Sequence, residues 1–285
     1  FSFAKVPYGT WIIREIESPK GYVLSEEEIA VTIGKVDEVV EIELVNYFIK
    51  GNIALTKVDE DYPDNKLSGA VFEVYSDTNG DGKLDKDDTL LGEMKELDGG
   101  VYQMSELRYG KYLVKESKAP TGFVLDEDVY AVSIEENGKT YTVENKAGVG
   151  FINAAQKGSL KIVKTSSDGK VEDFSFRVTG VDYDKTFKTD KNGEIVIEGL
   201  RIGDYTVSEV NDKASAGYIL PADKQVTVKV DATAIVQMHN EFRDTPKTGD
   251  DFNLGLWVSL AVLSVVGAGV LGFVGYKNRK KKKED

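Results

Sequence analysis

One pattern occurs three times in this chain of 285 residues and restricts its fold more than any other feature. Each copy starts with a glycine, runs through alternating β-branched or aromatic residues to a glutamate, and closes on a glycine followed by an aromatic residue. This alternation is typical of a β-strand with one buried face. The copies lie at 9–22, 110–123 and 203–218. A segment that recurs at such an interval predicts tandem domains of one fold.

Each copy has a glutamate that lies an even number of residues from the alternating apolar side chains of its strand. These glutamates are Glu15, Glu116 and Glu209. Alternate residues of a strand share one face, so these carboxyl groups are predicted to point inward. A single glutamate at such a position is more often a strand end that leans into solvent. Three at the same phase favour burial, which is costly unless the carboxyl group is paired or neutralised.

Two other polar residues share this phase in the two full copies of the repeat. A lysine, Lys57 or Lys164, closes the apolar face of the first predicted strand, and an asparagine, Asn153 or Asn240, closes that of the last. The first copy has only the asparagine, Asn46, and its lysine is expected before residue 1. The sequence therefore predicts a lysine, a glutamate and an asparagine that face one apolar interior.

The rest of the repeats consists of short alternating runs separated by glycine-containing turns, without a long amphipathic helix. Many short strands at this spacing predict an all-β chain of tandem Ig-like sandwiches. We expect the C-terminal half of one domain at 1–50, with its last strand at 39–48, and full domains at 51–157 and 158–242. These three segments are called the first, second and third unit below.

The composition argues against several classes of function. A net charge of −13 argues against nucleic acid as a partner, because phosphates require a basic surface. The absence of cysteine excludes disulfides, and a single histidine, His239, argues against a histidine-based catalytic site. The first nine residues do not resemble a signal peptide. Since the first repeat also lacks its front half, we expect this chain to be the C-terminal part of a longer protein.

The C-terminal segments predict a membrane anchor. After a polar linker at 243–251, residues 252–276 carry no charge and are long enough for a helix that crosses a bilayer. The basic end at 277–285 is expected to stay in the cytoplasm, which places the repeats outside the cell. A buried core helix is the alternative for the apolar run, but the run has no amphipathic face.

The predicted polar set suggests a specific reaction. Burial lowers the pKa of a lysine and raises that of a glutamate, because the charged forms lose hydration. A neutral lysine amine is a nucleophile, and a protonated glutamate can polarise an asparagine amide and carry protons. The product would be a Lys–Asn amide, formed once per domain with loss of ammonia. It would join the first strand to the last and stabilise a domain without cysteines.

The units resemble the Cna B-type (SpaA-like, prealbumin-like) domains of Gram-positive surface proteins and pilins. The glutamate box of that family reads Y-x-L-x-E-x-x-A-P-x-G-Y. YLVKESKAPTGF at 112–123 matches it nearly residue by residue, and IIREIESPKGY at 12–22 matches well. YTVSEVNDKASAGY at 205–218 lacks the Ala-Pro and carries an insertion. The resemblance covers most of residues 1–242.

The resemblance implies β-sandwiches with a spontaneous Lys–Asn or Lys–Asp isopeptide bond, formed with a catalytic glutamate and no cofactor. The third unit departs from the box, so a sandwich without a crosslink is the alternative there. The implied sets are Lys57, Glu116 and Asn153 in the second unit, Glu15 and Asn46 in the first, and Lys164, Glu209 and Asn240 in the third.

The tail resembles a sortase sorting signal, which consists of a short motif, an apolar span and a basic end. The usual motif is Leu-Pro-x-Thr-Gly, and here it reads Thr245, Pro246, Lys247, Thr248 and Gly249. The resemblance implies that a sortase cuts after Thr248 and joins it to cell-wall peptidoglycan. The threonine at the first position leaves open which sortase accepts it, or whether the protein stays in the membrane.

An aspartate-rich segment at 77–88 follows the D-x-[DN]-x-D-G pattern of calcium loops, with Leu84 at the usual apolar position. Its last position is aspartate rather than the usual glutamate of EF-hands, and no helices flank it. A solvated turn between strands is therefore the alternative to a Ca²⁺ site. The predicted oxygen ligands come from Asp77, Asn79, Asp81, the Lys83 carbonyl, Asp85 and Asp88.

Together these features predict a non-enzymatic stalk of a wall-anchored adhesin or pilin-like protein at the cell surface. Its expected partners are a sortase, peptidoglycan, other pilin subunits or a host extracellular protein, and the membrane before sorting. Two alternatives stay open. The chain could be the stalk of a surface enzyme whose catalytic domain lies upstream, or it could itself be a module that binds a host ligand.

Overall fold

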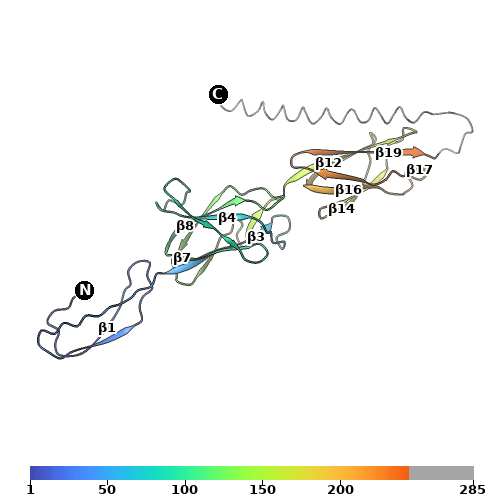
Figure 1. The fold of residues 1–285 in the computed structure, drawn as a ribbon. Coiled ribbons are helices and arrows are strands. Elements are labelled where there is room, and N and C mark those ends of the chain that lie inside the picture. The colour runs from blue at the N-terminus through green and yellow to red at the C-terminus, as the bar shows by residue number, and fades with distance from the viewer. Residues whose placement is uncertain (244–285) are drawn as a thin grey trace, which may run out of the picture.

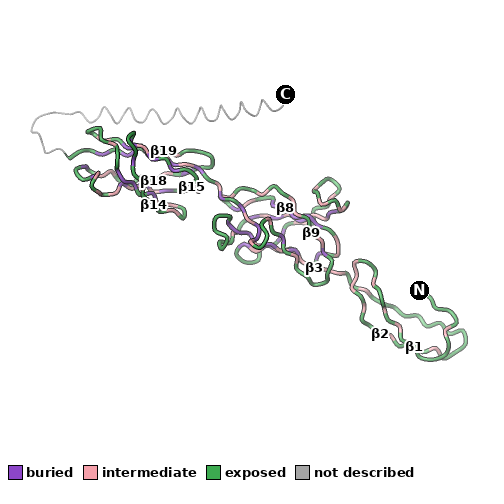
Figure 2. Tube along the Cα trace, turned by 180° about the vertical axis from the view of Figure 1, so that it is seen from behind, coloured by how far each residue is buried: buried purple, intermediate pink, exposed green. Residues whose placement is uncertain are grey.

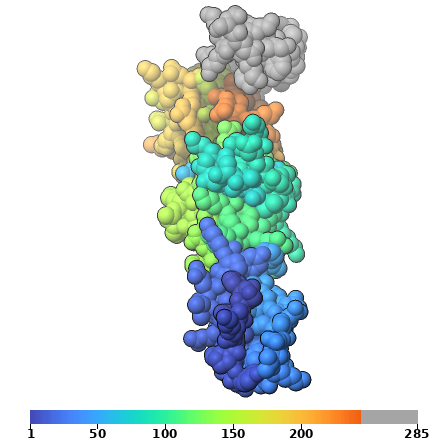
Figure 3. Space-filling model, turned by 90° about the vertical axis from the view of Figure 1, so that its left-hand side faces the viewer, coloured from blue at the N-terminus to red at the C-terminus, as the bar shows by residue number. Residues whose placement is uncertain are grey.

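The computed structural model describes residues 1–243 and contains only strands and irregular segments over that range. The three units follow one another end to end, and the first unit, which contains the N-terminus, lies at one end of the row (Figures 1 and 3). The all-β prediction is thus confirmed for these residues. Among them there is no helix long and apolar enough to span a membrane. The predicted sorting motif, membrane helix and basic tail lie outside the described residues.

The second unit is a sandwich of two sheets around one apolar core, which includes Phe72, Tyr102 and Phe151. Its first sheet has the order β5–β4–β8–β9, and its second has the order β10–β3–β7–β6, with β11 also on β3. The strands of the first sheet are β4 (Val71–Ser76), β5 (Thr89–Glu93), β8 (Gly110–Lys118) and β9 (Val129–Ile134). Those of the second are β3 (Lys50–Asp59), β6 (Lys95–Glu96), β7 (Val101–Arg108), β10 (Thr140–Thr142) and β11 (Phe151–Asn153).

The third unit repeats this plan around a core that includes Phe174, Phe176 and Tyr205. Its sheets have the orders β14–β13–β16–β18 and β15–β12–β19–β17. The strands of the first are β13 (Ser175–Gly180), β14 (Tyr183–Lys188), β16 (Gly203–Glu209) and β18 (Lys224–Val228). Those of the second are β12 (Lys157–Ser166), β15 (Glu194–Arg201), β17 (Tyr218–Ile219) and β19 (Thr233–Phe242).

In both sandwiches the first strand pairs in parallel with the last. Lys57 of β3 lies opposite Phe151 of β11, and Lys164 of β12 lies opposite Met238 of β19. The asparagine therefore lies two residues beyond the partner of the lysine in each unit. Since alternate residues share a face, this common register places the lysine and the asparagine on the same side of the sheet.

The first unit contains one hairpin, β1 (Gly9–Arg14) with β2 (Glu28–Ile33), and only Val31 among its hydrophobic residues is buried. Figure 2 shows the buried residues concentrated in the other two units. The predicted strand at 39–48 is wrong, because the structure has no strand there. In the other units the corresponding strand pairs with the first strand of its own sandwich. Residues 1–47 offer no such partner, and an unpaired strand is not stable in water.

The same hydrogen bonds join each unit to the next. In both junctions, the glycine that closes the glutamate box accepts a bond from a linker N–H, and the linker carbonyl accepts one from the following unit. The bonds are Ile49 N to Gly21 O (2.9 Å) and Tyr109 N to Ile49 O (2.9 Å), then Gln156 N to Gly122 O (2.8 Å) and Ile202 N to Gln156 O (3.1 Å). The sequence repeat therefore extends to the contacts between units.

An ion pair adds to the junction between the second and third units. Arg201, the last residue of β15, donates to both carboxylate oxygens of Asp59, at 2.6 and 2.8 Å, and to Asp61 at 3.0 Å. The side chains of Asp59 and Arg201 are only 3% and 15% exposed. Burial raises the pKa of Asp59, but the hydrogen bonds from Arg201 and from the backbone of Asp61 and Tyr62, together with the charge of Arg201, outweigh it and the net pKa is lowered. The carboxylate is thus stabilised in its charged form by the neighbouring unit.

Replacing Arg201 by alanine should therefore lower the free energy of unfolding by about 2–5 kcal/mol, because the buried Asp59 carboxylate loses its partner. Denaturant unfolding of the chain measures the loss. Arg177→Ala is the matched control, since Arg177 makes a similar two-point pair with Asp184 whose side chains are 56% and 55% exposed. Exposed pairs contribute about 0–1 kcal/mol. Equal losses from the two variants would contradict the expected role of the junction.

Candidate functional site

The structure brings Lys57, Glu116 and Asn153 together in the core of the second unit. Lys57 lies on β3 and Asn153 on the parallel strand β11, while Glu116 comes from β8 of the opposite sheet. The three residues are 0%, 0% and 3% exposed. Each belongs to a strand whose inward residues are otherwise apolar, so three polar groups meet where the sheets enclose them.

The atoms of this set are within bonding reach of one another. The Lys57 amine donates hydrogen bonds to Asn153 Oδ1 and, at 3.2 Å, to the Phe151 carbonyl. Asn153 Nδ2 donates to Glu116 Oε1 at 3.0 Å and to Oε2 at 2.9 Å. Lys57 Nζ lies 3.5 Å from Glu116 Oε1. One carboxylate oxygen is therefore close to both the lysine nitrogen and the asparagine nitrogen.

The surroundings favour the neutral amine of Lys57. Burial lowers its pKa to about 8, although the nearby carboxyl groups of Glu116 and Asp126 raise it in part. The Phe151 ring centroid lies 4.7 Å from the lysine nitrogen, so an aromatic face closes the site next to β11. At neutral pH, a lysine with a pKa lowered in this way is uncharged far more often than an exposed lysine.

The third unit has the same residues with a different arrangement. Lys164, Glu209 and Asn240 are buried, and Asn240 Nδ2 donates to Glu209 Oε1 at 2.6 Å. Lys164 Nζ donates instead to the Thr165 carbonyl at 2.6 Å, and in residues 1–243 no hydrogen bond joins it to Asn240. Burial lowers the pKa of Lys164 and raises that of Glu209. Glu209 Oε2 and Asn240 Oδ1 are buried without a partner in the described structure.

One of these unpaired atoms, Glu209 Oε2, lacks a backbone hydrogen bond that the glutamates of the other two units receive. In the second unit, the backbone N–H of Asp126 donates to Glu116 Oε2 at 2.9 Å, ten residues after the glutamate. In the first unit, the N–H of Ser25 donates to Glu15 Oε2 at 2.8 Å, again ten residues on. In the third unit the position four residues after the closing Gly217 is Pro221, which has no backbone N–H, so Glu209 Oε2 receives no such bond.

The first unit contains the remaining two predicted residues. Asn46 Nδ2 donates to Glu15 Oε2 at 2.6 Å and to the Val23 carbonyl at 3.1 Å. The asparagine and the glutamate are thus paired as in the other units, although Asn46 is not on a strand. Within residues 1–243 no lysine is hydrogen-bonded to this pair.

The predicted calcium loop forms a turn between β4 and β5 in which the side-chain oxygens accept backbone N–H groups of the loop itself. Asp77 accepts from Gly80 at 2.6 Å and from Gly82 at 3.1 Å. Asn79, Asp81, Asp85 and Asp88 each accept at least one bond of the same kind, and the Lys83 N–H donates to Asp81. In the part of the chain that the structure describes, no group of three or more acidic, histidine or cysteine side chains is arranged to hold a metal. Calcium binding stays a prediction.

Three residues that lie next to the Lys57 site were not predicted from the sequence. Asp126, Tyr130 and Asn145 form a hydrogen-bonded group that contacts both Glu116 and β11. The only sequence signal was the position of Asp126, ten residues after the glutamate. Asn145 lies in an irregular segment, where no periodicity indicates its contacts.

A family model described as SpaA, a prealbumin-like fold domain, matches residues 1–47, 51–147 and 158–242. This chain belongs to that family. The SpaA match includes all three copies of the glutamate box, and the second and third SpaA units are the two complete sandwiches described above. Among curated proteins, none matches the chain in sequence.

Several solved structures also match this chain. The Bacillus anthracis TIE protein is 26% identical with a TM-score of 0.64, and the match covers 83% of this chain and 42% of the TIE protein. The chain thus spans less than half the length of that relative. The minor pilin GBS52 of Streptococcus agalactiae matches at 18% identity and a TM-score of 0.31, over 70% of this chain and all of GBS52. The shaft pilin SpaA of Lactobacillus rhamnosus GG matches at 14% and 0.31, over 69% and 99%.

Proposed function

We propose that this chain is the structural stalk of a sortase-anchored, adhesin or pilin-like surface protein, and that a Lys57–Asn153 isopeptide bond reinforces its second unit. The observation that carries the proposal is the buried contact of the Lys57 amine with the Asn153 side chain, beside Glu116. The family and the row of sandwiches support a structural role. Anchoring to peptidoglycan by a sortase rests on the sequence of the tail.

The geometry supports a balanced route to the bond. The neutral Lys57 amine attacks Asn153 Cγ, which forms the new C–N bond while the Cγ–Nδ2 bond breaks. Glu116 Oε1 lies 3.5 Å from the lysine nitrogen and 3.0 Å from Asn153 Nδ2. Its carboxyl group can therefore take the proton that the amine loses and deliver it to the departing nitrogen. The products are one secondary amide and one molecule of ammonia.

The bond would close nearly the whole sandwich into one covalent loop. It joins β3 to β11 across 96 residues, so nearly the entire second unit lies between its two ends. In the third unit, Lys164 is hydrogen-bonded to Thr165 rather than to Asn240. We therefore propose a slower reaction there, since the amine must turn away from the Thr165 carbonyl before it can attack.

The mass of the intact chain tests the proposal. Each internal amide lowers the mass by one ammonia, about 17 Da, without a change in sequence. We expect a deficit of one ammonia from the second unit and a second, slower one from the third. Glu116→Gln should remove the first and leave the second, and Glu209→Gln should do the opposite. A chain with the full calculated mass would contradict the crosslink.

A further inference from the structure

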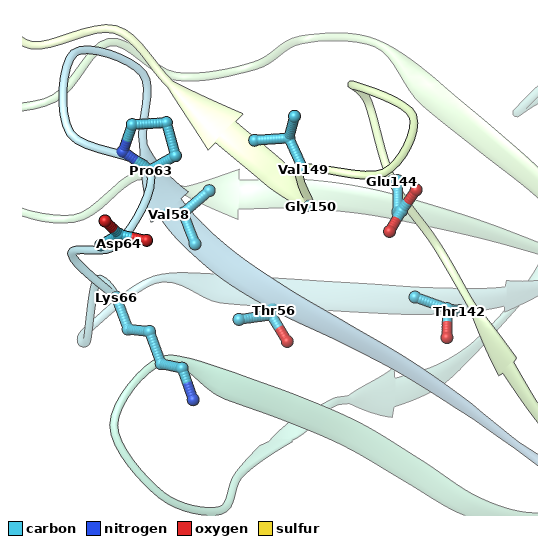
Figure 4. A pocket seen from close by; sticks show the side chains of 9 residues that line it. All are labelled: Thr56, Val58, Pro63, Asp64, Lys66, Thr142, Glu144, Val149 and Gly150. Atoms are coloured by element: carbon cyan, nitrogen blue, oxygen red, sulfur yellow. The ribbon is translucent and has the colours of Figure 1, made fainter.

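The pairing of β3 with its parallel neighbours is interrupted in the second unit. β10 pairs with residues 52–54 of β3, and β11 pairs with residues 57–59. Between these strands the chain makes a turn at 144–150, closed by a bridge between Lys146 and Gly150. A pocket of about 300 Å³ lies at this interruption (Figure 4). In the third unit β19, with ten residues, pairs with β12 without a break, whereas β10 and β11 of the second unit have three residues each.

A side chain from this turn takes the place of a neighbouring strand for β11. Asn145 Oδ1 accepts a hydrogen bond from the Ile152 N–H at 2.7 Å, and its Nδ2 donates to the Ile152 carbonyl at 2.9 Å. Both backbone groups of Ile152 are thereby satisfied on the side away from β3. Ile152 directly precedes Asn153, so these two bonds restrain the backbone that carries the asparagine side chain.

Asn145 is in turn connected to the glutamate. Its Nδ2 also donates to Asp126 Oδ2 at 2.7 Å, and the Tyr130 hydroxyl donates to the same oxygen at 2.8 Å. The backbone N–H of Asp126 donates to Glu116 Oε2. The group formed by Asn145, Asp126 and Tyr130 therefore contacts the backbone beside Asn153 at one end and the Glu116 carboxyl group at the other.

The same group is in contact with the ring that lines the lysine. Tyr130 packs edge-on against Phe151, with ring centroids 5.1 Å apart at an angle of 71°. Phe151 is the aromatic residue beside the Lys57 amine. Asp126, Tyr130 and Asn145 are each only partly exposed, so their hydrogen bonds face limited competition from water.

We propose that Asn145, held by Asp126 and Tyr130, is a positioning residue for the Lys57–Asn153 crosslink. It keeps β11 against β3 where the ladder is interrupted, and it fixes Asn153 relative to Glu116. This inference rests on the crosslinking reaction proposed above. Intramolecular reactions depend steeply on the alignment of the reacting atoms, so a small displacement of β11 should slow bond formation strongly.

The rate of crosslinking in the full chain tests the proposal. The chain is made by cell-free synthesis, quenched at intervals and digested with trypsin, and the branched peptide that joins Lys57 to Asn153 is quantified by mass spectrometry. We expect Asn145→Ala to slow its formation by about 10- to 100-fold. Asn137→Ala is the matched control, because Asn137 accepts the Lys50 N–H at 3.0 Å in the same unit but does not contact the site. It should stay within about twofold of the wild-type rate.

An isosteric variant separates positioning from a general loss of stability. In Asn145→Asp, the new carboxylate meets the Asp126 carboxylate and the Ile152 carbonyl, and the Tyr130 hydroxyl lies nearby. Its protonated form has one O–H, which recovers one of the two lost donors, so its rate relative to wild type should rise several-fold as the pH falls from 8 to 5. Protonation of Lys57 slows the reaction of both chains, so dividing the rate of the variant by the wild-type rate at each pH removes this effect.

The outcomes are distinguishable. If the wild-type chain gives no branched peptide, the proposed crosslink is wrong and the positioning role falls with it. If the wild-type chain is crosslinked and Asn145→Ala reacts as fast as Asn137→Ala, only the positioning role is overturned. A slow Asn145→Asp variant without any relative gain at low pH would also overturn it, because the hydrogen-bond donor would then be irrelevant.

Discussion

Replacing Glu116 by glutamine is expected to lower the free energy of unfolding of the second unit by about 4–5 kcal/mol, through loss of the crosslink. The bond would close a loop of 96 residues, and cross-linking a loop of that size restricts the unfolded chain by this amount in the chain-entropy account of disulfides. Glutamine keeps the size of the side chain, so the packing of the core changes little. The matching fall in melting temperature is roughly 15–40 °C for a domain of about 100 residues.

A double-mutant comparison separates the stability that the crosslink contributes from the stability that the glutamate side chain contributes. In an Asn153→Ala background the bond cannot form, so Glu116→Gln should then cost far less than in the wild-type chain. Thermal unfolding followed by circular dichroism, with the mass of each variant checked beforehand, measures both steps. Equal costs in the two backgrounds would mean that the crosslink contributes nothing to the stability of the second unit.

The face of its strand on which each of the three polar residues lies could be predicted from the sequence, because it depends only on local geometry. Side chains alternate along any strand, so Lys57, Glu116 and Asn153 share the phase of the apolar residues whatever the strands pair with. The order of strands and their register are long-range properties. The recurrence of the pattern and the resemblance to a known family indicated only that the first and last strands of a unit lie close together. The strand order and the parallel pairing of β3 with β11 come from the structure.

The features that were predicted wrongly or not at all also depend on contacts between distant parts of the chain. Residues 39–48 alternate as a strand should, but a strand also needs a neighbour along its length, and in the described part of the first unit only the end of this segment, at Phe48, is bridged to another segment, at Tyr22. Asn145 could not be identified from sequence, because its role depends on an interruption of the ladder far from any periodic segment. Arg201 acts on Asp59 across a unit boundary, which no pattern within one repeat reveals.

Pulling on the second unit from its two ends should release almost no hidden length in the wild-type chain. Force enters along β3, and a Lys57–Asn153 bond would carry it directly to β11, so the 96 residues between them would remain folded. The chain contains no cysteine, so Tyr47→Cys and Ala154→Cys, at exposed positions just before β3 and just after β11, provide the only attachment points.

Glu116→Gln should restore a large unfolding step in the same measurement. Without the bond, those 96 residues can extend, and at about 3.3–3.6 Å per residue they add roughly 300 Å to the contour length. Force spectroscopy resolves such a difference within one recording. Asn137→Gln, a polar change in the same unit away from Lys57, should behave as the wild type does. If the wild-type unit also lengthened by its full contour, the covalent path between β3 and β11 would be absent, and the stalk would resist tension by its hydrogen bonds and packing alone.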